Sequence, residues 1–363
     1  MKVLALNGGS SSLKLAVFDG DRVVGRDGVD GEPAGAQARD LLERTLDAHP
    51  DVTVVGHRLV HGGPEVGWHT EVDDDVRRRL EGGRSIDPLH VVPALEVLDL
   101  VRGRLPDARH VACLDSAFHA TMPEVARTYA VPRRWRELGM RRYGFHGLSY
   151  AWARDRAADL LGRSLDDLAM VLVHAGGGTS TCAVLEGASV WTSMGMTSLA
   201  GAVMVGRSGS VDPGALLWLQ SEHRLSPEEL RRGLEQDGGM TGLSDGLGGD
   251  TRDLHRAASQ GHPGARLALD VFVFRLRQEV AAAAACLPRL DALVFTGDIG
   301  EDDPEIRQQV CDGLATLGLD GPLDPGQDED QLIRIAAGRP TVVLVHLGEE
   351  QQMARICHEV LGR

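Results

Sequence analysis

Short apolar runs bounded by turn residues alternate with longer amphipathic stretches along most of this chain. Brief apolar runs between glycine, serine and aspartate predict buried strands, and apolar positions three or four residues apart predict helices. Strands are expected at residues 3–6, 13–18, 52–55, 111–114, 292–296 and 342–346. Helices are expected at residues 32–51, 76–82, 93–104, 150–161, 265–287, 304–317 and 349–360. This alternation predicts an α/β protein.

The first predicted hairpin joins its strands through Gly8, Gly9 and three serines at positions 10–12. Backbone N–H groups and hydroxyls in such a turn suit an anionic phosphate. Asn7 precedes the turn, and Lys14, one of only two lysines in the chain, follows it. A lysine supplies a compact point charge rather than a planar fork. Taken alone, the segment is equally compatible with an ordinary Gly/Ser hairpin.

A second hairpin of the same kind follows half a chain later. Residues 171–187 read VLVHAGGGTSTCAVLEG, and residues 16–20 align with residues 183–187 without a gap. A repeat at this separation predicts two related domains, each with a phosphate-binding hairpin. Two such hairpins facing one cleft would grip the two ends of a polyphosphate.

Composition narrows the class of protein and of ligand. The chain has 363 residues, which fits two domains, and its net charge of −15 argues against general binding of nucleic acid or anionic membranes. No segment approaches the roughly 18 apolar residues of a membrane span, and no signal peptide is recognisable. The five scattered cysteines are typical of thiols in a reducing cytoplasm, so we expect a cytoplasmic protein.

Several polar residues stand at strand ends or in irregular segments. The chain has neither a P-loop nor a Rossmann fingerprint. Irregular stretches are expected at residues 189–213, 237–252 and 297–302, and long irregular stretches in compact domains are often functional. Arg58 and Arg207 suit bidentate binding of carboxylate or phosphate, with a structural salt bridge as the alternative. His146 suits charge stabilisation or a structural hydrogen bond. Asp115 and Glu349 suit a metal site or a helix cap.

Five motifs, taken together, resemble the signature segments of the acetate kinase family. They are NGGSSSLK at 7–14, GHRLVHGG at 56–63, LDSAFHATMP at 114–123, RRYGFHG at 141–147, and TSMGMT at 192–197 with GRSGSVDPG at 206–214. The resemblance implies an α/β fold of the duplicated, two-domain actin-like ATPase type, with a central cleft. It further implies one domain at residues 1–114 plus 350–363 and a second, nucleotide-side domain at 115–349.

The resemblance also implies the activity. Family members reversibly transfer the γ-phosphoryl group of ATP to a short carboxylate such as acetate, which gives an acyl phosphate and ADP and requires Mg²⁺ or Mn²⁺. A carboxylate is already ionised at neutral pH and needs no general base, so the enzyme must mainly position and neutralise two anions. We therefore expect Asp115 to orient a group or a metal-bound water. Small carboxylates and nucleotides are the expected partners, together with a second copy of the chain in a homodimer.

Site residues follow from the resemblance, motif by motif. The catalytic set is Asp115, Arg58, Arg207, His146 and His90, and the magnesium ligands are Asn7 and Glu349. The nucleotide and phosphate set is Ser10, Ser12, Lys14, His174, Gly176, Gly177, Gly178, Asp250, Arg252, Asp298, Ile299, Gly300 and Glu301. The pocket for the acyl chain is Val60, Leu89, Phe145 and Ser198.

The chain departs from the family pattern mainly on the nucleotide side and around the acyl pocket. Gly177 stands where the family usually has Asn, Asp298 replaces a glycine, and Ser198 replaces a proline. Asp298 either binds a ribose hydroxyl or repels the nucleotide. Two alternatives therefore remain beside an ATP-dependent carboxylate kinase. One is the same chemistry with another phosphoryl donor such as pyrophosphate, and the other is a non-catalytic ligand sensor.

Overall fold

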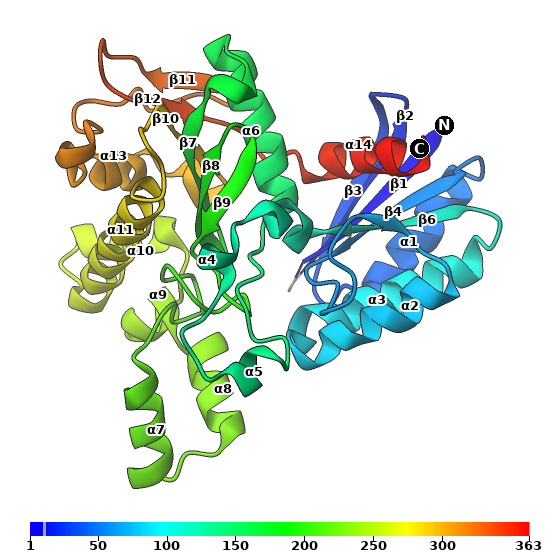
Figure 1. Cartoon of the computed structure of the whole chain (residues 1–363), viewed down its shortest axis with the longest axis horizontal. Helices are drawn as coiled ribbons and strands as arrows, with labels where there is room; N and C mark the ends of the chain where they lie inside the picture. The colour runs from blue at the N-terminus through cyan, green and yellow to red at the C-terminus, as the bar shows by residue number, and fades with distance from the viewer. Residues whose placement is uncertain (10–11, 363) are drawn as a thin grey trace. The chain divides into compact units, whose positions relative to one another are not determined.

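The computed structural model describes residues 1–9 and 12–362 (Figure 1). The chain forms two compact units. Unit 1 comprises Met1–Ala120, Phe145–Trp152 and Gly348–Arg363, and unit 2 comprises Thr121–Gly144 and Ala153–Leu347. The expected domains at 1–114 with 350–363 and at 115–349 stay a prediction. The expected phosphate residue Ser10 lies outside the described residues.

Unit 1 is built on one mixed sheet in the strand order β3-β2-β1-β4-β6-β5. The strands are β1 (Lys2–Gly8), β2 (Ser12–Asp19), β3 (Arg22–Asp30), β4 (Val54–Leu59), β5 (Thr70–Glu71) and β6 (Arg109–Leu114). The predicted hairpin is present, because β1 pairs antiparallel with β2. Strands β1, β4 and β6 run parallel to one another, so their carboxyl ends meet at one edge of the sheet.

Helices cover both faces of this sheet. They are α1 (Ala36–Ala48), α2 (Asp74–Leu80), α3 (Pro88–Arg104) and α14 (Glu349–Leu361), with 3₁₀ turns at Glu81–Ser85 and Asp115–Thr121. Leu41 and Leu42 of α1 pack with Val97 of α3 on one face. Met353 and Ile356 of α14 pack on the other face, so the C-terminal helix belongs to the same unit as the N-terminal strand (Figure 1).

Unit 2 repeats this topology. Its sheet has the order β11-β12-β10-β7-β8-β9. The strands are β7 (Ala169–Ala175), β8 (Thr179–Leu185), β9 (Ala188–Thr192), β10 (Ala292–Thr296), β11 (Gln331–Arg334) and β12 (Thr341–Leu344). As in unit 1, an antiparallel three-stranded meander continues into two parallel strands and then one antiparallel edge strand. The duplication expected from the repeat, and with it the fold class, is confirmed.

The helices of unit 2 vary in burial. They are α4 (Glu124–Arg127), α5 (Arg133–Arg136), α6 (Gly147–Leu161, which begins in unit 1), α7 (Pro213–Glu222), α8 (Pro227–Glu235), α9 (Gly239–Leu243), α10 (Thr251–Ser259), α11 (Pro263–Ala284), α12 (Asp298–Asp302) and α13 (Pro304–Asp312), with 3₁₀ turns at Leu165–Asp167 and Ala315–Leu317. Helix α11 supplies Phe272 and Leu276 to the core. Helices α7 and α8 have no buried residues and project away from the unit 2 sheet (Figure 1).

Several local expectations were wrong. Residues 237–252 are not irregular throughout, because they contain helix α9 and the first residues of α10. Residues 189–213 are not irregular throughout, because their first residues belong to strand β9. The segment 297–302 is a short helix, α12, entered through Gly297. Helix α3 begins at Pro88 rather than at residue 93, because Asp87 caps it by accepting a hydrogen bond from the His90 N–H and Pro88 fits the first turn.

None of the helices in the described part of the chain combines the length and the hydrophobicity needed to cross a bilayer. The cysteines at 113, 182, 286, 311 and 357 are free thiols. The expected cytoplasmic location stays a prediction.

Candidate active site

Four expected site residues converge at the carboxyl edge of the unit 1 sheet. Asn7 lies near the end of β1, Arg58 near the end of β4, and Asp115 directly after β6. Glu349 is the first residue of α14. Because the three strands are parallel and adjacent, their ends bring these side chains together from distant parts of the sequence. We call Asn7, Arg58, Asp115, Glu349 and its neighbour Glu350 the carboxylate cluster.

Arg58 is the centre of the carboxylate cluster. Its Nη2 and Nε donate to Asp115 Oδ2 at 2.9 and 3.3 Å, and its Nη1 donates to Glu349 Oε2 at 3.0 Å and to Asn7 Oδ1 at 2.8 Å. A guanidinium has five N–H groups. Among the described residues, these bonds use four of the five N–H groups, so one Nη2–H is left over for an anion.

The side-chain amide of Asn7 joins the two glutamates. Its Nδ2 donates to Glu349 Oε2 at 2.8 Å and to Glu350 Oε1 at 2.7 Å. Asn7 is therefore oriented by Arg58 on one side and by two carboxylates on the other. Glu350 was not expected from the sequence, where two adjacent glutamates at a helix start give no sign of which one faces the site.

Burial and charge pull the pKa values of the cluster in opposite directions. Burial raises the pKa of the Asp115 carboxyl above its ordinary value, and Glu349 adds to the rise while Arg58 opposes it. Burial disfavours the charge on Arg58, but Asp115 and Glu349 outweigh burial and raise the pKa of the guanidinium. With three carboxylates around one guanidinium, the cluster favours a further cation.

The carboxylate cluster fits a divalent ion that keeps most of its waters. Among the described residues, no group of three or more His, Cys, Asp and Glu side chains is placed to form a protein cage for a metal. Mg²⁺ commonly uses only one or two carboxylates and keeps several waters. Asp115 Oδ1 is buried and has no hydrogen-bond partner in the described part of the chain. A hard carboxylate oxygen left in this state beside Glu349 fits a magnesium ion or its water.

The histidines of the expected catalytic set, His90 and His146, lie in unit 1. His90 Nδ1 lies 2.8 Å from Asp87 Oδ1, and the charge of His90 acts on Asp115. His146 is buried and has a φ of 59°, an uncommon conformation for a non-glycine residue. A residue held in this left-handed region is over-determined by its surroundings, as is frequent at functional sites.

The residues of the expected acyl pocket are divided between the two units. Val60 and Phe145 are buried in unit 1, and the ring of His61, next to Val60, lies 5.8 Å from the Phe145 ring. Leu89 is 42% exposed. Ser198 is buried in unit 2, where its carbonyl accepts from Arg207 Nη1 at 2.9 Å.

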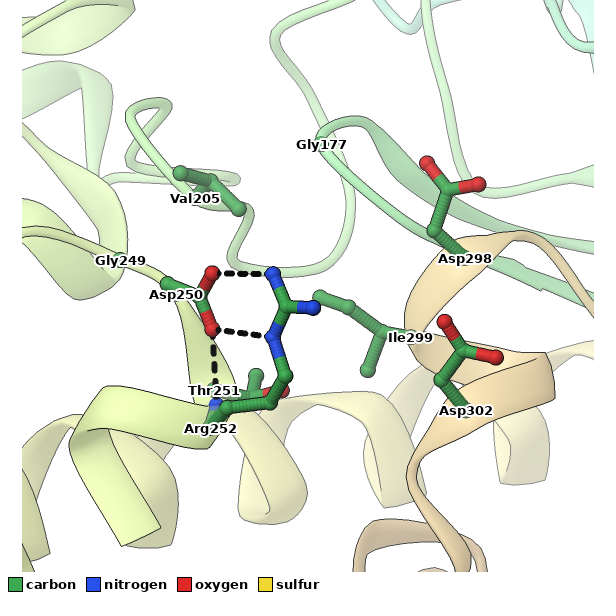
Figure 2. A pocket seen from close by; sticks show the side chains of 9 residues that line it. All are labelled: Gly177, Val205, Gly249, Asp250, Thr251, Arg252, Asp298, Ile299 and Asp302. Carbon is green, nitrogen blue, oxygen red and sulfur yellow. Dashed lines mark hydrogen bonds and ion pairs between the residues drawn. The ribbon is translucent and has the colours of Figure 1, made fainter. Parts of the chain in front are cut away.

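A pocket of about 340 Å³ in unit 2 is lined by five residues of the expected nucleotide set, Gly177, Asp250, Arg252, Asp298 and Ile299 (Figure 2). Asp298 and Asp302 lie one helical turn apart on α12 and line one side of it. Asp250 and Arg252 form a bidentate ion pair on the opposite side, with Nη2···Oδ2 at 2.6 Å and Nε···Oδ1 at 3.0 Å. Arg252 holds the pKa of Asp250 at about 2. The remaining lining residues are Val205, Gly249 and Thr251.

Gly297 lets the start of α12 approach β7 closely. Gly297 has a φ of 85°, and a Cβ there would lie 2.7 Å from the Ala175 carbonyl oxygen. Around Gly177, by contrast, a Cβ would meet no atom within 4 Å, so its missing side chain leaves open space in the pocket. His174 is buried near the end of β7, and Gly176 and Gly178 close the turn through a backbone hydrogen bond of 3.0 Å.

Of the three expected phosphate residues in the first hairpin, Ser12 and Lys14 lie within the described residues. Lys14 is opposite Asn7 in the β1–β2 register, and its side chain is exposed. No ion pair with Lys14 is formed within the described residues, so its charge is available to an anion. The remaining turn residues Gly300 and Glu301 belong to α12, where Gly300 is buried and Glu301 is half-buried.

Comparison with known proteins identifies the family. The model of the acetokinase family matches residues 28–355. This chain belongs to the acetokinase family. Acetate kinases of Natranaerobius thermophilus and Deinococcus deserti are 35% and 39% identical to it over 399 aligned positions, which cover all of this chain and 100% and 98% of theirs.

Solved structures of acetokinases agree with the fold. The acetate kinase of Porphyromonas gingivalis has a TM-score of 0.89 at 30% identity, and the propionate kinase of Francisella tularensis has 0.89 at 28%; each comparison covers 99% of both chains. The expected family, the phosphotransferase class and ATP-dependent phosphorylation of a carboxylate are confirmed. As family members do in general, this chain uses ATP and a divalent metal.

Some residues of these sites were missed by sequence reasoning. Asp302, Thr251 and Val205 line the unit 2 pocket, and Glu350 belongs to the carboxylate cluster. Asp302 had a usable signal, because it lies four residues after Asp298 in a segment that proved helical. Val205 had none, since an apolar residue in an irregular segment carries no sign of what it faces.

Proposed function

We propose that this acetokinase transfers the γ-phosphoryl group of ATP to acetate or a similarly short carboxylate, with the reacting groups held by the carboxylate cluster and by Arg207. The proposal rests mainly on the contacts of Arg58, which donates to both Asp115 and Glu349 and keeps one N–H for an anion. A structural salt bridge needs only one carboxylate partner. A guanidinium surrounded by three carboxylates at the strand ends suits a site that gains and loses ions during a reaction cycle.

The residues divide the work of bringing two anions together. The substrate carboxylate is ionised at neutral pH and attacks as it is, so no residue needs to remove a proton. Arg58 and Arg207 neutralise the carboxylate and the transferring phosphoryl group, and His146 and His90 donate hydrogen bonds nearby. Asp115 orients its neighbours through Arg58. These roles act by positioning and electrostatics rather than by covalent catalysis.

Asn7, Asp115 and Glu349 are the residues that would hold the magnesium ion and its waters. When bound, the ion supplies positive charge at the phosphates. Asn7 keeps Glu349 and Glu350 in place through its amide, and Arg58 keeps the cluster from repelling itself before the ion arrives. Ser12 and Lys14, with the undescribed Ser10, complete the phosphate end of the site in this proposal.

The donor we propose is a ribonucleoside triphosphate, with Asp298 accepting a hydrogen bond from a ribose hydroxyl. Asp298 is exposed to the pocket and has no hydrogen bond or ion pair within the described residues. Asp302 and Asp250 add two more carboxylates, and the charge of Arg252 is already neutralised by Asp250. An acidic pocket suits the uncharged nucleoside end of ATP and disfavours a bare pyrophosphate.

The acceptor we propose is a short carboxylate such as acetate. Val60 and Phe145, which are expected in the acyl pocket, are both buried apolar residues of unit 1. One methylene more or less in an apolar pocket changes specificity by only about 1–3 kcal/mol. Acetate and propionate should therefore both react, with a graded preference.

A panel of donors and acids tests these assignments. Acyl phosphate is trapped with hydroxylamine from acetate, propionate or butyrate, with ATP, 2′-deoxy-ATP, 3′-deoxy-ATP or pyrophosphate as donor. We expect ATP to exceed at least one deoxy analogue by about tenfold in kcat/KM, and Asp298→Gly to remove that difference. Pyrophosphate as efficient as ATP would contradict the donor assignment, and no product with any donor would favour a ligand sensor.

We further propose a homodimer formed through unit 2. Helix α7 carries Leu217 and Trp218 at 65% and 54% exposure, and Phe274 of α11 is 56% exposed. Arg275 donates to the Ser210 carbonyl, which joins α11 to the segment before α7. Large exposed apolar side chains often mark a protein–protein interface, and a second copy of this chain would cover them.

A further inference from the structure

The last passage of the chain from unit 2 into unit 1 occurs between Leu347 and Gly348. The next residue, Glu349, belongs to the carboxylate cluster. Two residues of extended chain span about 7 Å at most, so the position of the Leu347 backbone limits where Glu349 can lie. What holds Leu347 therefore matters to the cluster.

Leu347 is held by Glu301 of helix α12. Its backbone N–H donates to Glu301 Oε1 at 2.9 Å. The same oxygen accepts from the Gly297 N–H at 3.1 Å, at the start of α12. Asp298 and Ile299, between these two residues, line the nucleotide pocket. One carboxylate oxygen thus ties the pocket-lining helix and the end of unit 2 together, so the two move as one.

The C-terminal end of α12 is held by a second residue, Arg307. Arg307 of α13 is 1% exposed, and its Nη1 donates to the carbonyls of Gly300 and Glu301 at 2.7 and 2.6 Å. Its Nη2 donates to the Pro325 carbonyl. With its C-terminal carbonyls anchored by a buried guanidinium, α12 responds to a ligand as a rigid body rather than by fraying.

On the unit 1 side of the Leu347–Gly348 bond, Gly348 packs directly against the indole ring of Trp152. A Cβ on Gly348 would lie 2.2 Å from the Trp152 ring, so no side chain fits there. The guanidinium of Arg355 covers the same ring at 4.7 Å from its centroid. A shift of the Leu347–Gly348 backbone therefore changes the surroundings of Trp152.

We infer that Glu301 is a positioning residue that transmits occupancy of the nucleotide pocket to Glu349. The inference rests on the proposed function, because it takes the unit 2 pocket as the nucleotide site. A nucleotide that moves α12 moves the Glu301 carboxylate, the Leu347 N–H follows, and Glu349 is placed in the carboxylate cluster two residues later. Glu301 itself does not line the pocket, so nucleotide affinity and the transmitted effect are separable.

The test uses Trp152 as a reporter. The full chain is labelled with 5-fluorotryptophan, and the Trp152 resonance among the five tryptophans is assigned with Trp152→Phe. ADP is titrated in the presence of EDTA, with ¹⁹F NMR for the resonance and calorimetry for the dissociation constant. In the wild type, we expect ADP to shift the Trp152 resonance.

Three variants separate transmission from binding. Glu301→Met has no acceptor oxygen, and we expect it to bind ADP within about threefold of the wild type, to lose the Trp152 shift, and to have about tenfold lower kcat. Glu301→Gln keeps an acceptor oxygen and should restore both the shift and kcat. Glu305→Gln, on α13 and mostly exposed, is the matched control and should behave as the wild type.

The outcomes distinguish this inference from the proposed function. A wild type that does not bind ADP overturns the nucleotide pocket and the inference with it. A wild type that binds ADP without a Trp152 shift, or a Glu301→Met protein that binds ADP and keeps the shift, overturns the inference alone. If Glu301→Met does not fold, Gly348→Ala replaces it, because its methyl group would displace the indole. An unchanged kcat in Gly348→Ala then overturns the inference.

Discussion

Arg58 carries most of the electrostatic balance in unit 1, because it is the cation that neutralises two buried carboxylates. Asp115 is 1% exposed and Glu349 is 7% exposed. Removing one partner from a buried ion pair leaves an uncompensated charge, which costs more than the pair itself contributes. The residue is therefore both part of the proposed reaction and a condition for the strand ends to stay together.

Arg58→Ala should lower the free energy of unfolding by about 3–5 kcal/mol, since it leaves Asp115 and Glu349 facing each other without a counter-charge. Urea unfolding measures the change. The matched control is Arg77→Ala, which breaks ion pairs with Asp99 and Glu81 whose carboxylates are exposed and should cost about 1 kcal/mol. Equal losses in the two variants would contradict the burial argument.

At this scale the sequence predicted the residue types better than their partners. Asn7, Arg58, Asp115 and Glu349 were all expected at the site, and the structure brings them together. Arg58 was expected after a strand, but it lies within β4. The Arg58 guanidinium donates nearly all of its N–H groups to other residues of the protein. This arrangement depends on side-chain directions in three strands and a helix, and no single segment of the sequence determines it.

The start of helix α6 packs tightly against the end of β6. A Cβ on Gly147 would lie 1.9 Å from the Asp115 carbonyl oxygen and 2.7 Å from Phe118 Cβ. Glycine is required there by the close approach of the two elements rather than by its backbone angles. This contact fixes the position of His146, which precedes Gly147, relative to Asp115, which follows β6.

Gly147→Ala should therefore reduce both stability and activity. Overpacking of this kind costs about 1–3 kcal/mol or more, and it moves Asp115. Gly103→Ala in α3 is the control, because a Cβ at Gly103 meets nothing within 4 Å and alanine in a helix should stabilise by about 1 kcal/mol. Thermal unfolding and kcat measure both variants. A Gly147→Ala protein as stable and active as Gly103→Ala would refute the contact.

The last residue of β6 is anchored by a neutral histidine. The Leu114 N–H donates to His69 Nδ1 at 3.0 Å, so this nitrogen must be unprotonated. Burial lowers the pKa of His69 from its usual 6.5 to about 4. As the pH falls from 6.5 towards 4, His69 binds a proton in the unfolded chain but not in the folded chain. The free energy of unfolding therefore decreases as the pH falls through this range.

Between pH 7 and pH 5, His69 should contribute a loss of about 2 kcal/mol of unfolding free energy. His69→Gln, which does not titrate, should reduce the pH dependence of the wild type by that amount. Urea midpoints at pH 7 and pH 5 give the difference. A variant with the same pH dependence as the wild type would show that His69 titrates normally in the folded protein.

Among the elements, fully buried strands were predicted well and exposed helices were not. The strand expected at residues 292–296 has the same first and last residues as β10, because a run of five apolar or small residues ends at a glycine turn. Helix α7, PGALLWLQSE, has apolar residues on every side and none of them is buried, so its periodicity gave no signal. Strand β9 was missed because its mixed polar residues resemble the loop that follows.

The two halves of the molecule share a topology more faithfully than they share sequence. Gly20 and Gly187, aligned by the sequence repeat, both have positive φ, at 59° and 76°. Each closes the turn after the second strand of its meander. The repeat therefore predicted the duplicated fold from one hairpin in each half, whereas the antiparallel edge strands β5 and β11 are too short or too polar to be recognised in sequence.

The oligomeric state is a property of the whole molecule. If the exposed residues of α7 and α11 are covered by a second copy, Trp218→Glu should convert a dimer into a monomer by placing a charge in an apolar interface. Sedimentation velocity measures the mass. Trp68→Glu in unit 1 is the control, since Trp68 is similarly exposed at 60%. A monomeric wild type, or a dimer that both variants keep, would contradict the proposed surface.

The role of the carboxylate cluster is tested most directly by acyl phosphate formation from acetate and Mg²⁺–ATP, trapped with hydroxylamine, in the wild type, Arg58→Ala and Arg77→Ala. We expect acyl hydroxamate from the wild type and from Arg77→Ala. For folded Arg58→Ala we expect a loss of about 100-fold or more in kcat/KM. Folded Arg58→Ala protein with wild-type turnover would show that the carboxylate cluster is not where the phosphoryl group is transferred.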